Sequence, residues 1–94
     1  MSRLTEKEIE QGLGATQGWQ REGDEIVRVF VFDDFVRAMG FVNSTALLAE
    51  KMNHHPDIDI RWNKVTLRLS THSAGGLTSK DFDLAGQINA LQPR

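Results

Sequence analysis

Three histidines are the side chains of this chain that are best suited to acid–base chemistry. His54 and His55 are neighbours just before Pro56, and His72 follows later in the sequence. Imidazole is the only side chain whose unperturbed pKa, about 6.5, allows it to give and take protons near neutral pH. Glu50 lies one helical turn before His54, so its carboxylate could orient that ring. The histidines therefore predict a site for proton transfer, with Glu50 in support.

Other interpretations of the same residues compete with this one. A histidine pair before a proline is also typical of a loop that ends a helix, and His72 alone is typical of a strand end. Three imidazoles can bind zinc, but neighbouring residues of an extended chain point to opposite faces, so His54 and His55 would not easily share one ion. The sequence has no cysteine, which excludes thiolate ligands and disulfides. We therefore favour proton transfer over metal binding.

Composition limits the classes of protein to which the chain can belong. With 94 residues it is long enough for one modest core, so we expect a single domain over residues 1–94. Hydrophobic residues make up 39% and charged residues 26%, which is typical of globular proteins. The eleven basic residues are scattered among thirteen acidic ones, so we expect no direct contact with nucleic acid. No apolar run resembles a signal peptide or a membrane span, and we expect a cytoplasmic protein without a membrane partner.

The residues before the histidines predict a helix, a hairpin and a second helix. Thr5 and Glu8 have the spacing of a capping box, which starts the first helix. Residues 18–25 and 25–34 predict two strands joined at Gly23-Asp24, and the second strand is apolar on both of its faces. Asp33 or Asp34 would cap a helix over residues 35–52. Its predicted core-facing stripe consists of Phe35, Met39, Val42 and Ala46, and is widened by Leu47, Leu48 and Met52.

The residues around and after the histidines predict two more strands and a last helix. Residues 57–62 and 64–72 alternate apolar and polar side chains, with a turn at Asn63-Lys64. His72 then falls at the end of the second strand, on the face opposite the apolar side chains. Thr78 or Ser79 caps the last helix. We therefore predict an α+β fold of two layers, in the order α-β-β-α-β-β-α, with helices packed on one face of a four-stranded antiparallel sheet.

The candidate site residues also form one longer pattern. Its seven positions are Glu50, His54-His55-Pro56, Trp62, His72 and Asp81. This pattern resembles the signature of the pterin-4a-carbinolamine dehydratase family, and the resemblance covers nearly the whole chain. It implies a hydro-lyase that dehydrates 4a-hydroxytetrahydropterin to the quinonoid dihydropterin by general acid–base catalysis, in tetrahydropterin recycling, with no metal or redox cofactor.

The resemblance also implies roles for individual residues. His54, His55 and His72 become the catalytic histidines and Glu50 a supporting carboxylate, with His54 and His72 as the principal pair. Residues expected to bind the pterin substrate are Asn53, Ser70, Thr71, Ser73, Trp19 and Asp81, the last two at the rim. Asp81 has a second interpretation, because it stands three residues after Thr78 and so fits the carboxylate of a capping box. Asn53 and Ser73 depart from the family, which often carries acidic residues at both positions.

Self-association and partner binding follow as further expectations. The strand over residues 25–34 is apolar on both faces, so part of a sheet face or edge should stay uncovered, and this favours a homo-oligomer. The family implies a homodimer or homotetramer. Its animal members also act as dimerisation cofactors of a homeodomain transcription factor, which leaves protein binding as the alternative function, beside a three-histidine metal site.

Overall fold

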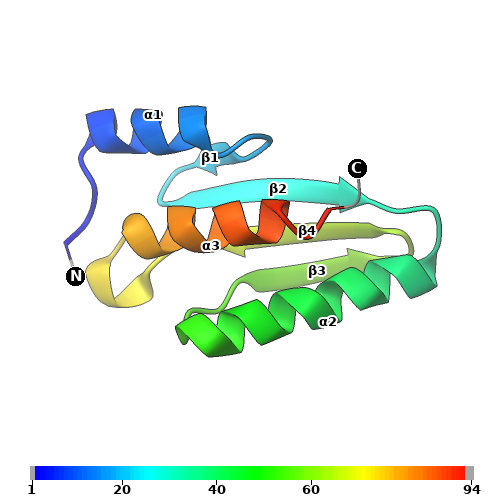
Figure 1. The fold of residues 1–94 in the computed structure, drawn as a ribbon. Coiled ribbons are helices and arrows are strands. Elements are labelled where there is room, and N and C mark those ends of the chain that lie inside the picture. The colour runs from blue at the N-terminus through cyan, green and yellow to red at the C-terminus, as the bar shows by residue number, and fades with distance from the viewer. Residues whose placement is uncertain (1, 93–94) are drawn as a thin grey trace.

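The computed structural model describes residues 2–92, which form a four-stranded antiparallel sheet and three helices (Figure 1). The strands lie in the order β1-β2-β4-β3, so β1 and β3 form the edges. The elements in chain order are α1 (Glu6–Ala15), β1 (Gln20–Glu22), β2 (Glu25–Val31), α2 (Phe35–Met52), β3 (Asp57–Arg61), β4 (Lys64–Leu69), the 3₁₀ turn η1 (His72–Ala74) and α3 (Ser79–Asn89). The predicted fold class and element order are confirmed.

The helices cover one face of the sheet. On β2, Ile26 and Phe30 are buried, and on β4 the residues that pair with them, Leu69 and Val65, are buried as well. The opposite face is open at the Val29 end of β2, where Val29 is 53% and Val31 60% exposed, whereas Val27 is buried. The sheet is therefore half of a two-layer structure, with its core between the sheet and the helices.

Each of the three α-helices has an N-cap residue that was among those predicted from the sequence. Thr5 and Glu8 form a full capping box on α1, with Thr5 Oγ1 accepting from the Glu8 amide at 3.2 Å. Asp34 caps α2 by accepting from the Arg37 amide at 2.8 Å. Thr78 caps α3. These caps satisfy backbone amides that the first helical turn leaves without partners.

The buried face of α2 differs only in part from the predicted stripe, since Val42, Leu48 and Met52 pack against the core as predicted. Its buried residues are Ala38, Phe41, Thr45 and Ala49, whereas Phe35, at the start of the helix, stays half exposed. The prediction followed the helical spacing that starts at Phe35, but the fully buried face combines two alanines and a threonine with Phe41. Small residues allow a helix to approach a sheet closely, and hydrophobic size alone does not reveal this.

The turn between β3 and β4 lies one residue earlier than predicted. Arg61 pairs with Lys64, so Trp62 and Asn63 form the turn, and Trp62 takes a left-handed backbone conformation with φ 51°. Asn63 fixes this position because its side-chain amide donates to the carbonyl of Phe32 at 2.8 Å. Trp62 is consequently exposed instead of belonging to a strand.

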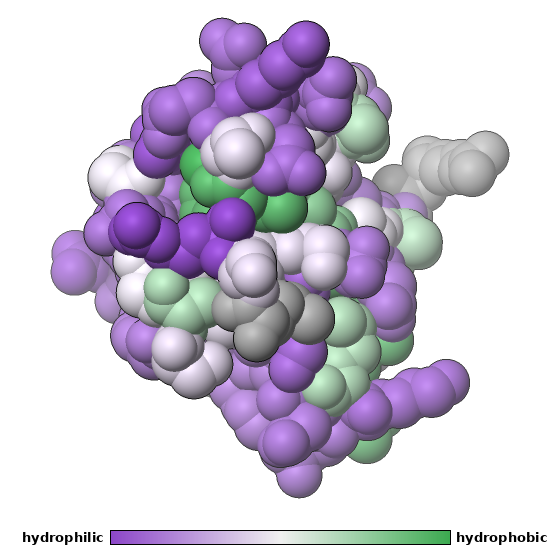
Figure 2. Space-filling model, turned by 90° about the vertical axis from the view of Figure 1, so that its left-hand side faces the viewer, coloured by the Kyte–Doolittle hydropathy of each residue, from purple (hydrophilic) through white to green (hydrophobic). Residues whose placement is uncertain are grey.

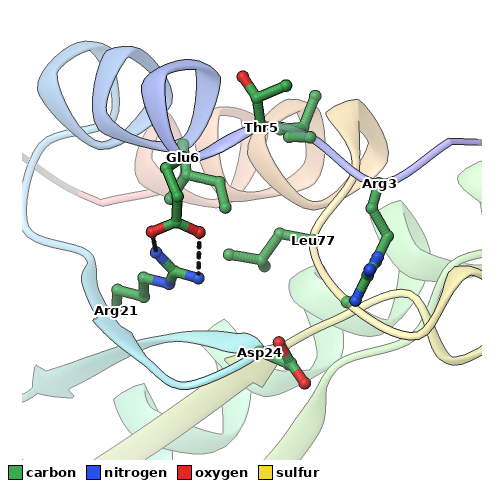
Figure 3. A pocket seen from close by; sticks show the side chains of 9 residues that line it. Arg3, Thr5, Glu6, Arg21, Asp24 and Leu77 are labelled. Atoms are coloured by element: carbon green, nitrogen blue, oxygen red, sulfur yellow. Dashed lines mark hydrogen bonds and ion pairs between the residues drawn. The ribbon is translucent and has the colours of Figure 1, made fainter.

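The N-terminal segment is hydrogen-bonded to the loop between β4 and α3. The Leu4 amide donates to the carbonyl of Leu77 at 2.8 Å. Figure 3 shows Leu77 pointing into a hollow of about 370 Å³ under α1, beside the paired side chains of Glu6 and Arg21. None of the predicted site residues lines this hollow. The hydrogen bond from Leu4 ties the N-terminal segment to the loop that carries Ser70 to Thr78.

No helix within residues 2–92 combines the length and the apolar character that a bilayer crossing requires.

Candidate active site

The structure brings the three histidines together around one hollow of about 390 Å³. It lies where the exit of α2 meets the loop after β4. The residues that line it are Asn53, His54, His55, Ser70, Thr71, His72, Ser73 and Lys80. Figure 2 views the end of the molecule that carries η1 and the exit of α2, and shows a mostly hydrophilic surface with a hydrophobic area recessed below α1. A polar hollow of this kind suits a ligand rich in hydrogen-bonding groups.

The end of α2 places His54 and His55. Asn53 follows the helix in a left-handed conformation, φ 51° and ψ 44°, and its amide donates to the carbonyls of Ala49 and Glu50. The His54 amide also donates to the carbonyl of Ala49, at 3.1 Å. This left-handed C-cap reverses the chain before Pro56 can end the helix. As a result, the His54 side chain is buried against Asp81 of α3, whereas the His55 side chain is exposed.

His54 meets a buried carboxylate. Its Nε2 atom lies 2.6 Å from Oδ1 of Asp81, and His54 keeps only 8% of its surface exposed. The other oxygen, Oδ2 of Asp81, accepts from the Thr71 hydroxyl at 2.8 Å and from the Thr78 amide at 2.9 Å. Asp81 is fully buried and does not line the hollow, so its predicted place at the rim is corrected. Both of its oxygens already accept hydrogen bonds from protein groups. It also closes the capping box of α3, so both interpretations of this residue describe the same carboxylate.

Glu50 contacts a different histidine from the one predicted. Its Oε2 atom lies 2.5 Å from Nε2 of His55, and both side chains are more than half exposed. The prediction assumed that helical spacing continued to His54. The left-handed Asn53 interrupts that spacing, which takes His54 off the face of Glu50 and brings His55 onto it.

The loop after β4 supplies the opposite wall. β4 ends at Leu69, and the chain runs through Ser70 and Thr71 into η1, whose first residue is His72. The sequence placed His72 at the end of a strand, but the strand stops earlier because Thr71 forms an isolated bridge with Gly76 that closes a tight loop. His72 is exposed on this loop and lines the hollow.

Trp19 does not belong to this hollow. It is 4% exposed within the core and meets Phe30 edge to face, with ring centroids 6.1 Å apart. Its indole Nε1 donates to Oδ1 of Asn89 at 2.8 Å. The prediction that it lies at the rim is therefore corrected. An aromatic with a single polar atom is most stable where the ring is buried and that atom has a partner.

Two residues near the site were not predicted as site residues, although Thr78 was predicted as a helix cap. Lys80 lines the hollow, and Thr78 donates its amide to Asp81. The capping-box spacing of Thr78 and Asp81 could have indicated both residues, because it places Lys80 in the first turn of α3 beside Asp81. Within residues 2–92, no group of three or more histidine, aspartate and glutamate side chains has an arrangement that could hold a metal ion.

Comparisons with known proteins agree with the resemblance. The family model described as "Pterin 4 alpha carbinolamine dehydratase" matches residues 2–91. Relatives provisionally named pterin-4-alpha-carbinolamine dehydratase occur in Roseiflexus sp., 57% identical over 96% of this chain and 97% of the relative, and in Acidobacterium capsulatum, 56% identical over 97% and 99%.

One solved structure agrees with this family, and a second one shares the fold. A crystal structure from Brucella melitensis, named a transcriptional coactivator/pterin dehydratase, superposes with a TM-score of 0.92 at 43% identity, covering 95% of this chain and 97% of that one. A pterin dehydratase-like protein named as a RuBisCO assembly factor in the alpha-carboxysome shares the fold alone, at 22% identity and a TM-score of 0.64 over 78% of this chain and 84% of that one. This chain belongs to the pterin-4-alpha-carbinolamine dehydratase family.

Proposed function

We propose that this protein dehydrates 4a-hydroxytetrahydropterin to the quinonoid dihydropterin, in the cytoplasmic recycling of a tetrahydropterin. In this reaction the C4a–O bond breaks, a proton joins the departing hydroxyl to make water, and a proton leaves a ring nitrogen. The observation that carries the proposal is the convergence of His54, His55 and His72 on one polar hollow in a chain of this family. Both proton transfers lie within the range of imidazole near neutral pH, and the proposed reaction needs no metal or redox cofactor.

We assign the principal roles to His54 and His72. His54 leaves the exit of α2 and His72 begins η1, so they approach a molecule in the hollow from different elements. His55 is an auxiliary group, because its Nε2 is engaged by Glu50 at the exposed edge. Asn53, Ser70 and Ser73 supply polar groups along the lining, and these are candidates for binding the amide edge of a pterin.

Stopped-flow measurement of carbinolamine loss tests this function. The wild-type protein should accelerate the dehydration, and His54→Ala or His72→Ala should lower the rate by about a hundredfold or more, the usual contribution of a positioned acid or base. Glu10→Gln, at an exposed position of α1, is the control and should keep the wild-type rate. A wild-type rate no faster than the rates of the two histidine variants would remove the proposal.

We further propose that a second copy of this chain pairs with the edge strand β3. Ile58 and Ile60 are 38% and 37% exposed, and they lie on the helix side of the sheet because they pair with Leu67 and Val65 of β4. In an antiparallel pairing centred on Asp59, each isoleucine of one copy would oppose an isoleucine of the other.

The charges of β3 favour the same register. Asp57 of one copy would oppose Arg61 of the second copy at both ends of the pairing. At the centre the two Asp59 side chains would meet, and each has Arg61 of its own chain 3.2 Å away to offset its charge. In this register β3 would therefore match a second copy of itself both in its charged side chains at the ends and in its isoleucines.

A further inference from the structure

We infer that Thr71 is a positioning residue: its hydroxyl orders the Asp81 carboxylate and thereby fixes neutral His54 as the tautomer protonated at Nε2. Nδ1 is then the only ring nitrogen of His54 that can exchange a proton with a bound molecule. The family resemblance had implied substrate binding for Thr71. The kinetic part of this inference rests on the proposed function, whereas the tautomer does not.

The hydrogen bonds around Asp81 have one consistent direction. The Thr78 amide can only donate, and it donates to Oδ2 of Asp81 at 2.9 Å. The Thr71 hydroxyl donates to the same oxygen at 2.8 Å. The Thr78 hydroxyl lies 2.8 Å from that of Thr71, so it donates in turn and accepts from the Lys80 amide at 3.3 Å. Each hydroxyl has one proton to donate, and this arrangement uses each proton once.

This direction determines where the shared proton of His54 lies. With two donors already at Oδ2 of Asp81, the remaining oxygen, Oδ1, faces Nε2 of His54 at 2.6 Å. A carboxyl group is ordinarily a stronger acid than imidazolium, so the proton belongs on the ring nitrogen and not on the carboxylate. His54 therefore donates from Nε2, and the neutral ring carries its lone pair on Nδ1.

The position of the Thr71 hydroxyl is fixed by its own loop. The Thr71 amide donates to the carbonyl of Gly76 at 2.9 Å, and the Gly76 amide returns a bond to Thr71 at 3.3 Å. Gly76 is buried, and a Cβ there would lie 2.9 Å from Cδ of Arg3. The absence of a side chain at this position lets the N-terminal segment pack against the loop beside Leu77 (Figure 3). Thr71 thus approaches Asp81 from a braced element that is separate from α3.

Burial makes the network dependent on each member. Thr71 is 5% exposed, and Thr78 and Asp81 are fully buried. Water has little access to replace a missing hydroxyl in such a place. Without the Thr71 donor, the Thr78 amide alone would hold Oδ2 of Asp81, so the carboxylate would be less firmly oriented and the proton of His54 less firmly held at Nε2.

The experiment compares Thr71→Val, which replaces the hydroxyl with a methyl group of similar shape, with Thr71→Ser, which keeps it. Long-range ¹⁵N–¹H spectra of the His54 ring, recorded where the ring is neutral, report the tautomer. Wild type and Thr71→Ser should show Nε2–H alone, and Thr71→Val should show both tautomers. In the stopped-flow assay, kcat of Thr71→Val should fall by about tenfold or more, as for other partners that orient a functional histidine, and Thr71→Ser should restore most of it.

Thr45→Val is the matched control. Thr45 is also fully buried, and its hydroxyl has no partner among the described residues, so the same chemical change should alter neither the tautomer nor kcat.

The outcomes separate this inference from the proposed function. If wild-type His54 is protonated at Nδ1 when neutral, the inference is overturned with no variant needed, even if Thr71→Val fails to fold. It is also overturned if Thr71→Val keeps both the Nε2–H tautomer and kcat. If the tautomers behave as expected but the wild type does not dehydrate the carbinolamine, the assignment of the tautomer is supported and the proposed function fails.

Discussion

Nε2 of His54 lies 2.6 Å from Oδ1 of Asp81, and this contact joins the exit of α2 to the first turn of α3. Asp81→Asn should lower the free energy of unfolding by about 1–3 kcal/mol and reduce the dehydration rate. Asp81 accepts three hydrogen bonds, whereas the amide nitrogen of an asparagine cannot accept, so one of these bonds is lost or His54 must change its tautomer. Urea denaturation and the stopped-flow assay measure the two effects. An unchanged urea midpoint would contradict the network.

Glu50→Gln should have a much smaller effect than Asp81→Asn. The Glu50–His55 pair lies 2.5 Å apart but is largely exposed to solvent, where ion pairs contribute at most about 1 kcal/mol. We therefore expect a small shift in the urea midpoint and a modest loss of rate. The double variant Glu50→Gln/His55→Ala should differ little from His55→Ala. A loss of rate as large as that of Asp81→Asn would show that the exposed pair carries the chemistry.

Asn53 tests the backbone that presents the histidines. With φ at 51°, it occupies a left-handed conformation that glycine adopts freely and alanine does not. Asn53→Ala should therefore destabilise the protein by about 1 kcal/mol, and Asn53→Gly should preserve its stability or raise it. Thermal unfolding of the two variants side by side gives the comparison. Equal stability of the alanine and glycine variants would rule out a strained C-cap.

The Glu6–Arg21 pair gives a pH dependence of known sign. The Arg21 guanidinium, which bonds both oxygens of Glu6, holds the pKa of that carboxyl below its ordinary value of 4.5. Because the folded pKa lies below the unfolded one, the stabilisation is complete above pH 4.5 and is lost as the pH falls through the lowered pKa.

Glu6→Gln should accordingly have a lower melting temperature than wild type at pH 7, and the difference should close under acidic conditions. Added salt should narrow it as well, because the pair is exposed. Glu10→Gln, another exposed position on α1, serves as the control for loss of a negative charge. A difference that stays constant from pH 7 to pH 3 would exclude the ion pair as its cause.

Ile60→Lys should convert an oligomer to a monomer if a second copy pairs with β3. Sedimentation at micromolar concentration should give a mass above that of one chain for wild type and that of one chain for the variant. Val29→Lys is the matched control, because it places the same charge on the open face of the sheet, away from the β3 edge. A monomeric wild type would remove the proposal, and an oligomeric Ile60→Lys would move the interface elsewhere.

Local patterns in the sequence predicted the elements and their caps. Thr5 with Glu8, and Thr78 with Asp81, act within one helical turn, so their spacing suffices to identify them. Strands β3 and β4 were predicted because alternation is also a local property. Packing was not predictable in this way, as the buried face of α2 shows, since that face is chosen by the shape of the sheet and the other helices.

In the candidate site, too, the residues could be predicted from the sequence, but their contacts could not. His54, His55 and His72 could be nominated from their chemistry and from the resemblance, but their partners could not. Glu50 was assigned to His54 by helical spacing, and one left-handed residue changed its partner to His55. Trp19 was placed at the rim because it matches a family position, whereas its partner Asn89 lies in the last helix, far along the chain.

The buried carboxylate of Asp81 accepts hydrogen bonds from the first turn of α3 and from the ring of His54. His54 therefore cannot leave its place without disturbing the start of α3. Loops that open locally commonly lose function well below the temperature of global melting. Here the release of His54 would also strip the Thr78 amide and the Thr71 hydroxyl of their acceptor. Heat should therefore abolish activity in the same cooperative transition that melts the protein.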